Sequence, residues 1–99
     1  MMNKKPTFKE YMEKERDTLE MYTKAIAKVH GPHHPEIIEI RRIFETLEEK
    51  IATDSTDFAT EFKNLRTLTN DYQAPQDTCE TTVATYELLK EADRLYQTK

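Results

Sequence analysis

The sequence of 99 residues has room for one hydrophobic core, so we expect a single domain spanning residues 1–99. Hydrophobic residues make up 36% and charged residues 34% of it, with one glycine and four prolines, a composition that favours an all-α fold. The net charge of -4, with Lys and Arg interleaved among Glu, argues against binding to nucleic acid or to anionic lipid.

No apolar run approaches the ~18 residues of a membrane-spanning helix, and residues 1–12 have lysines without the apolar core of a signal peptide. Cys79 is the single cysteine, which excludes an intrachain disulfide and a zinc site with several cysteines. A lone cysteine also fits a reducing compartment. We therefore expect a soluble, cytoplasmic protein with no membrane contact.

The first predicted helix begins at Phe8 and ends at Gly31 and Pro32. Its stripe positions recur with gaps that alternate between four and three residues, the spacing of a helix in a bundle. This stripe consists of Phe8, Met12, Glu15, Leu19, Tyr22, Ile26 and Val29. Gly31 is expected to end the helix in a left-handed conformation, and Pro32 cannot continue it.

The second predicted helix begins near Pro35, a residue that suits a first helical turn, and has about 18 residues. One of its faces is apolar and is widened by two further isoleucines, so we expect it to be the best buried of the helices. The face consists of Ile37, Ile40, Phe44, Leu47 and Ile51, widened by Ile38 and Ile43.

The third predicted helix follows a run of N-cap candidates at residues 54–57 and ends at residues 72–75. Its apolar face consists of Phe58, Phe62, Leu65, Leu68 and Tyr72. The fourth predicted helix opens at Asp77, which has the spacing of a capping box with Glu80. Its apolar positions are Cys79, Val83, Tyr86, Leu89 and Ala92, followed by Leu88, Leu95 and Tyr96 near its end.

Helices joined by short turns pack against their neighbours in antiparallel fashion, which predicts an up-down-up-down four-helix bundle. The fourth helix is apolar over more than half of its circumference, whereas a helix packed on one side needs only a stripe. We therefore expect an exposed apolar surface on it that, together with the end of the first helix, serves a homo-oligomer, by default a two-fold dimer, or a protein partner.

All three histidines and the only glycine occur in the hexapeptide at residues 30–35. Imidazole is a good ligand for transition metals, so this turn is a candidate site for a single ion such as iron or zinc. The candidate ligands are His30, His33, His34 and Glu36. The alternative is a structural turn that caps two helices, because ligands this close in sequence rarely converge on one ion without others from elsewhere.

Two stretches of the chain resemble one known family. Residues 28–37, with the sequence KVHGPHHPEI, resemble the V-H-G-P-x-H-P-E-L turn of the hemerythrin-like iron-sulfur cluster repair proteins, also called repair of iron centres proteins. Residues 62–79 resemble that family's L-x-x-L-R-x-L-T-x-x-Y-x-x-P-x-x-x-C segment, and residues 86–90 continue the match. The resemblance implies a hemerythrin-like four-helix bundle.

In that family, histidines and glutamates from all four helices hold a di-iron pair that repairs clusters damaged by oxidative or nitrosative stress. The resemblance assigns His34 to one ligand position, puts Lys9 and Asp54 at two others, and leaves the closing histidine motif beyond Lys99. One matched histidine cannot hold an oxo-bridged iron pair.

The resemblance thus implies a shortened relative that has lost the di-iron site and the enzymatic activity. We expect it to act as an interaction or regulatory module linked to iron or to oxidative and nitrosative stress, with no cofactor. The alternative is a metal-handling protein that uses the histidine turn.

Two further residues admit two interpretations each. Glu15 is either a former bridging-ligand position or an ordinary carboxylate that reaches solvent or pairs with Lys50 or Arg66. Cys79 either packs in the core or is a reactive thiol whose pKa is lowered by the start of the last helix. No Ser-His-Asp order, phosphate-binding loop or HExxH motif occurs, so we expect no catalytic residues.

Overall fold

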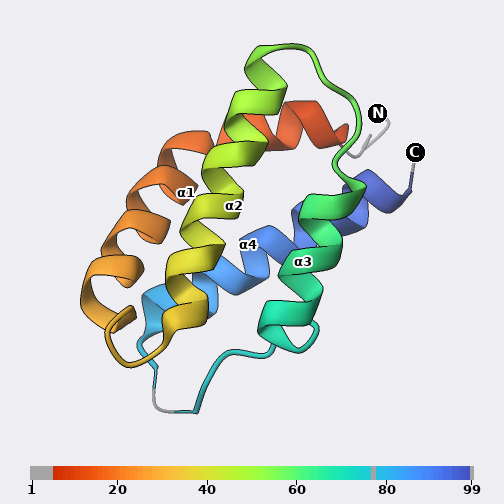
Figure 1. The fold of residues 1–99 in the computed structure, drawn as a ribbon. Coiled ribbons are helices and arrows are strands. Elements are labelled where there is room, and N and C mark those ends of the chain that lie inside the picture. The colour runs from red at the N-terminus through yellow and green to blue at the C-terminus, as the bar shows by residue number, and fades with distance from the viewer. Residues whose placement is uncertain (1–5, 77, 99) are drawn as a thin grey trace, which may run out of the picture.

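The computed structural model describes residues 6–76 and 78–98, and in these ranges it contains four α-helices and no strand. They are α1 (Phe8–His30), α2 (Pro35–Ala52), α3 (Ala59–Thr69) and α4 (Glu80–Gln97) (Figure 1). The prediction of an all-α fold is confirmed, and the arrangement is compatible with a four-helix bundle. Within the described ranges, no helix combines the length and the apolar character needed to cross a bilayer.

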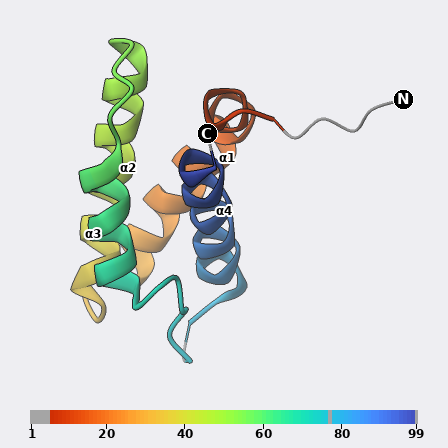
Figure 2. The ribbon, with the colours of Figure 1, turned by 90° about the vertical axis from the view of Figure 1, so that its right-hand side faces the viewer.

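The helices pack in three pairs. α1 packs against α4 and also against α2, while α2 packs against α3. Figure 2 shows α2 and α3 side by side and running in opposite directions, with α4 standing across from them. The backbones of α3 and α4 approach each other less closely, so side chains link these two helices.

A buried carboxylate makes this link. Asp93 of α4 is 4% exposed, and its two oxygens accept hydrogen bonds from the Arg66 guanidinium at 2.8 and 2.7 Å. The Tyr72 hydroxyl donates to the same carboxylate at 2.8 Å. Burial, together with this neighbouring carboxylate, holds the pKa of Tyr72 well above its usual range. The network therefore joins α3 and the segment after it to α4.

The core receives large side chains from every helix. The fully buried ones include Met12, Leu19, Ile26, Ile37, Ile40, Phe44, Leu47, Phe62, Leu65, Tyr86 and Leu89. Every member of this list was predicted from the helical stripes. The prediction that the second helix is the best buried is wrong, because α2 buries Ile37, Ile40, Phe44 and Leu47 while α4 buries eight residues. Ile38, expected to widen the buried face of α2, is 40% exposed.

The predicted stripe of α1 is partly wrong. Val29 is 64% exposed, whereas Tyr11 and Thr23, which lie outside the stripe, are buried. The reason is that α1 contacts both α2 and α4 and so buries a wider face. Both polar side chains are hydrogen-bonded in this buried face. The Tyr11 hydroxyl donates to the Leu88 carbonyl oxygen at 3.0 Å, and the Thr23 hydroxyl donates to the Leu19 carbonyl oxygen at 2.7 Å.

The ends of α1 differ in their capping. At the start, the Thr7 hydroxyl accepts from the Glu10 N–H at 3.1 Å and the Glu10 carboxylate accepts from the Thr7 N–H at 2.9 Å, a capping box. At the other end, the prediction of a left-handed Gly31 is wrong, because its φ is -53° and its ψ is -42°. A glycine suits this position for another reason: a Cβ there would lie 2.8 Å from Ile38 Cγ1 and closer still to the Ala27 carbonyl oxygen.

α3 is shorter than predicted and ends at Thr69 instead of residues 72–75. Asn70, Asp71 and Tyr72 take φ values of 51°, 63° and 67°, so the chain turns through the left-handed region. The Thr69 hydroxyl accepts from the Tyr72 N–H at 2.7 Å, which stabilises the turn. The turn places the Tyr72 hydroxyl where it donates a hydrogen bond to Asp93, and local sequence does not specify this hydrogen bond.

The predicted starts of α3 and α4 need correction. α3 begins at Ala59 with Phe58 as its N-cap residue, and among residues 54–57 it is the Asp57 carboxylate that accepts from the Ala59 N–H, at 3.2 Å. α4 begins at Glu80 with Cys79 as its N-cap residue and no side-chain cap. Asp77, the predicted cap, lies outside the described residues.

The exposed apolar surface predicted on the fourth helix is also wrong. Leu89 and Ala92 are fully buried, and Leu95 and Tyr96 are 7% and 9% exposed. Most of the apolar circumference is used because α4 packs on α1 and its Tyr96 ring meets the Phe62 ring of α3, while Leu88 is partly buried. Among the described residues, the exposed large apolar side chains are instead Met21, Val29, Ile38 and Val83.

Candidate functional site

The histidine turn and the start of α4 meet at one end of the molecule, which we call the turn end and define by His30 and Cys79. The His30 Nε2 atom lies 3.2 Å from the Cys79 Sγ atom, and the Thr82 hydroxyl lies 3.6 Å from the same sulfur. Cys79 is exposed, so the interpretation that it packs in the core is wrong. As the N-cap residue, it precedes the helix, and its side chain does not follow the apolar face.

These contacts favour the thiolate form of Cys79. The pKa of the thiol is lowered to about 6, first by the hydrogen bond from the Thr82 hydroxyl, with further contributions from the Thr82 backbone N–H and from His30. Burial is the second-largest influence on this pKa and opposes the shift, but the hydrogen bonds together outweigh it. Thiolates are the nucleophilic form of cysteine, so Cys79 is a chemically reactive group at neutral pH.

The other residues of the predicted metal site lie nearby but divide into separate contacts. His34 Nδ1 lies 3.4 Å from Glu36 Oε2, the ring centroids of His30 and His34 are 6.5 Å apart, and His33 is exposed. Within residues 6–76 and 78–98, no group of three His, Cys, Asp or Glu side chains is arranged to hold a metal ion. A metal site at this turn stays a prediction of the sequence.

The positions that the family resemblance assigns to ligands do not converge. Lys9 and Asp54 lie at the start of α1 and after α2, where Lys9 Nζ and Asp54 Oδ1 are 3.5 Å apart. His34 follows the opposite end of α1, a helix of 23 residues and therefore about 34 Å along its axis. Glu15, which the sequence allows as a former bridging-ligand position, lies in α1 and is partly buried.

The two partners named for Glu15 bind elsewhere. Lys50 pairs with Glu61 at 2.9 Å, and Arg66 pairs with Asp93 at 2.7 Å. The partial exposure of Glu15 is compatible with a carboxylate that reaches solvent, and its interpretation as a former ligand position stays a prediction.

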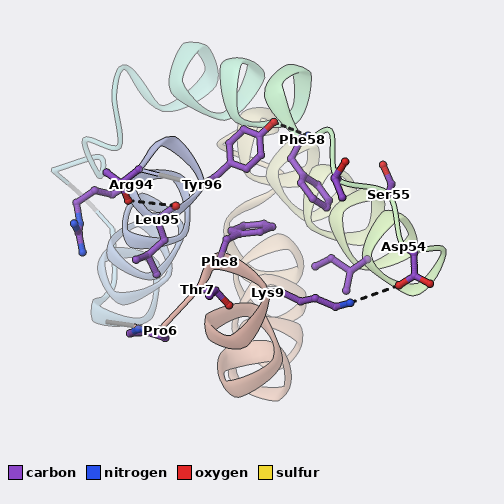
Figure 3. A pocket seen from close by; sticks show the side chains of 13 residues that line it. Pro6, Thr7, Phe8, Lys9, Asp54, Ser55, Phe58, Arg94, Leu95 and Tyr96 are labelled. Atoms are coloured by element: carbon purple, nitrogen blue, oxygen red, sulfur yellow. Dashed lines mark hydrogen bonds and ion pairs between the residues drawn. The ribbon is translucent and has the colours of Figure 1, made fainter. Parts of the chain in front are cut away.

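An apolar cavity of about 720 Å³ lies at the other end of the molecule, where the start of α1, the α2–α3 connection and the end of α4 meet (Figure 3). We call this the aromatic end. Its walls include Phe8, Ile51, Phe58, Leu95 and Tyr96. The Phe8 ring centroid lies 4.9 Å from that of Phe58 and 5.6 Å from that of Tyr96, so the rings form one cluster.

Polar side chains also line this cavity, among them Thr7, Lys9, Asp54 and Thr98. The Tyr96 hydroxyl accepts from the Phe58 N–H at 3.0 Å and is directed away from the cavity (Figure 3). Lys9 and Asp54 form their exposed ion pair across the opening. Phe8, Phe58 and Tyr96 were predicted as stripe residues, but nothing in the stripes indicates that these three meet at one end.

No protein-family model, curated protein or solved structure matches the chain. The resemblance to the hemerythrin-like repair proteins is therefore carried by the residues of the two sequence stretches alone. The features that bear on function are the Cys79–His30 contact at the turn end and the apolar cavity at the aromatic end.

Proposed function

We propose that the chain is a redox-responsive regulatory module, a shortened hemerythrin-like relative of the iron-sulfur cluster repair proteins that has lost the di-iron site. In this proposal, the Cys79 thiolate responds to oxidative or nitrosative conditions. The observation that carries the proposal is the 3.2 Å contact between Cys79 Sγ and His30 Nε2 at an exposed helix N-cap.

The chemistry is thiol–disulfide exchange with a low-molecular-weight disulfide. With a pKa of about 6, Cys79 is about nine-tenths thiolate at pH 7, against a few per cent for an ordinary cysteine. The thiolate attacks one sulfur of the reagent, a new S–S bond to Cys79 forms, the reagent's S–S bond breaks, and the leaving thiolate takes a proton from water. His30, donating its Nε2–H, stabilises the attacking thiolate until the new bond forms.

The composition favours a switch over a turnover enzyme. Cys79 is the only cysteine of the sequence, so no internal thiol resolves the mixed disulfide, which persists until an external thiol reduces it. The modification removes the anionic sulfur and with it the attraction that joins His30 of α1 to the start of α4. Val83, one helical turn beyond Cys79 and 40% exposed, adds apolar surface beside the switch.

The test is the pH dependence of the reaction of Cys79 with a small aromatic disulfide such as 4,4′-dithiodipyridine. We expect the rate to rise with pH and to reach half of its plateau near pH 6. Thr82→Val and His30→Ala should each move this midpoint upward. His33→Ala changes an exposed histidine of the same turn that does not touch the sulfur, so it is the matched control and should leave the midpoint in place.

Two outcomes would count against the proposal. A wild-type midpoint near the ~8.5 of a free cysteine would show that the turn end does not activate the thiol. A midpoint near pH 6 that is unchanged in both Thr82→Val and His30→Ala would show that other groups do so.

A second candidate function is metal handling at the turn end, favoured by one observation. Cys79 adds a sulfur donor 3.2 Å from the His30 ring nitrogen, and sulfur with imidazole is a donor set that zinc prefers. Two copies of the chain would then supply the four ligands of a tetrahedral ion. Zinc titration followed by light scattering should give one zinc per two chains, lost in Cys79→Ser and His30→Ala; a zinc-independent monomer would exclude this function.

A further inference from the structure

We infer that the cavity at the aromatic end binds a small amphipathic acid, with an aliphatic chain among the aromatic walls and a carboxylate at Lys9. The inference is independent of the thiol chemistry proposed for the turn end, because the two features lie at opposite ends of α1. It follows from the size of the cavity, the nature of its walls and the charges at its mouth.

The size and the walls suit a small organic ligand. Cavities that bind such molecules have volumes of roughly 300–1,000 Å³ and mostly hydrophobic and aromatic walls, and the volume here is about 720 Å³. Three segments that are distant in sequence supply the walls, through Phe8, Phe58 and Leu95. The Tyr96 hydroxyl accepts a hydrogen bond from the Phe58 N–H. Tyr96 therefore presents its ring to the interior of the cavity, and its hydroxyl does not have to lose a hydrogen-bond partner when an alkyl chain binds.

The mouth favours an anionic head group. Among the charged side chains that line the cavity, the cations Lys9 and Arg94 outnumber the anion Asp54, although the whole chain has a net charge of -4. The Arg94 guanidinium pairs with Glu91 and points away from the cavity in Figure 3. Lys9 is therefore the cation placed to meet a carboxylate at the opening.

The present partner of Lys9 can be exchanged. The side chains of Lys9 and Asp54 are 66% and 86% exposed and their charged atoms are 3.5 Å apart, the geometry of a surface pair that contributes little. A ligand carboxylate can replace Asp54 at the ammonium group, with the Ser55 and Thr56 side chains beside it at the cavity wall.

A small molecule fits this site better than a protein segment does. An extended peptide needs the edge of a sheet, and a helix needs a long groove for anchors at i, i+3, i+4 and i+7. The described residues form no strand, and the cavity lies at the meeting point of three chain segments instead of along a helix pair.

The experiment uses three probes with the same alkyl chain, each kept below its micelle concentration: dodecanoate, dodecanol and dodecyltrimethylammonium. Binding is followed by amide chemical shifts and by calorimetry. We expect saturable one-to-one binding of dodecanoate, weaker binding of dodecanol and the weakest binding of the cation. The largest shifts should fall on residues 7–9 and 54–58.

Three variants make the assignment specific. Lys9→Gln should weaken dodecanoate about threefold to fivefold, the range of an exposed charge pair, and Asp54→Asn should tighten it by a similar factor because it removes the competing carboxylate. Asn also tolerates the φ of 60° at this position. Thr56→Trp, at an exposed position of the wall, should fill the mouth and abolish binding.

Lys63→Gln is the matched control, since it removes an exposed lysine of α3 that does not line the cavity, and it should bind dodecanoate as the wild type does. Circular dichroism checks that each variant is helical. The inference is overturned by absence of saturable dodecanoate binding to the wild type, by equal binding of the cation, by shifts centred elsewhere, or by full binding to a helical Thr56→Trp protein.

Discussion

The two ends of the molecule are built in different ways. At the turn end, His30 and Cys79 touch through one contact between a ring nitrogen and a sulfur, and the neighbouring Val29 and Val83 are exposed. At the aromatic end, four rings from three segments pack together, with centroids 4.9 to 5.7 Å apart. The comparison teaches that the aromatic cluster and the reactive group of this protein lie at opposite ends, so changes at one end should spare the property of the other.

The largest effect is expected at the aromatic end. Phe58 is 4% exposed and contacts both Phe8 and Tyr96, so Phe58→Ala should lower the free energy of unfolding by about 4 kcal/mol through lost burial and a new cavity. Urea unfolding followed by circular dichroism measures the change. The matched variant at the turn end is Val29→Ala, which should change the free energy of unfolding by less than about 0.5 kcal/mol. Equal losses in the two variants would remove the distinction between the ends.

The second effect concerns the link between α3 and α4. Asp93→Ala leaves the Arg66 guanidinium and the Tyr72 hydroxyl without their shared acceptor, and should cost about 2 to 3 kcal/mol. The loss stays below that of a fully buried ion pair because the Arg66 side chain is 38% exposed. Glu91→Ala, which removes an exposed carboxylate two residues earlier, is the control and should be nearly neutral. An Asp93→Ala protein as stable as the control would show that the buried carboxylate contributes nothing.

A third variant sharpens the comparison at the turn end. Gly31→Ala places a Cβ 2.8 Å from Ile38 Cγ1, so the turn must shift, and we expect a loss of about 1 to 2 kcal/mol in the free energy of unfolding. His33→Ala, at an exposed neighbouring position, should be neutral. If Gly31→Ala proves neutral as well, the turn end yields more easily than the close contacts of this Cβ with Ile38 and the Ala27 carbonyl oxygen indicate.

A further expected effect is a pH dependence of stability that belongs to Cys79, an exposed group at which solvent screening reduces the contribution. Its pKa is about 6 in the folded protein and 9.0 as the ordinary value, so the folded state favours the deprotonated thiol. This contribution to stability is fully present above the ordinary pKa, declines as the pH falls from 9 towards 6, and vanishes below the folded pKa. Relative to Cys79→Ser, the wild type should therefore gain stability between pH 6 and pH 9 in urea unfolding. Parallel pH profiles of the two proteins would mean that folding does not shift the thiol pKa.

The sequence predicted α1 and α2 closely because their boundaries are encoded locally. Pro35 starts α2, and the Gly31–Pro32 pair ends α1, although the glycine does so in a right-handed conformation. The end of α3 could not be predicted in the same way. A turn with Asn70 in a left-handed conformation ends this helix, and it places Tyr72 against Asp93, which lies 21 residues further along the chain.

The candidate sites show the same limit more strongly. Cys79 fits the apolar face of a helix only if the helix includes it. The N-cap residue is Cys79 instead of the predicted Asp77, and this difference of two residues leaves the thiol at the surface. Its partner His30 is 49 residues away, a separation at which local pattern carries no information. For the cavity, helical stripes identify which rings are buried but not that three helix ends leave a space between them.

The pairing of α1 with α4 also has a consequence for the order of folding. α1 and α2 are joined by a turn of four residues and can form a helical hairpin through nearby contacts. α4 can join α1 only after a loop of about 50 residues closes, which adds entropic cost before its contacts form. We therefore expect substitutions within the α1–α2 hairpin to slow folding, whereas substitutions of Leu89 or Ala92 should chiefly accelerate unfolding.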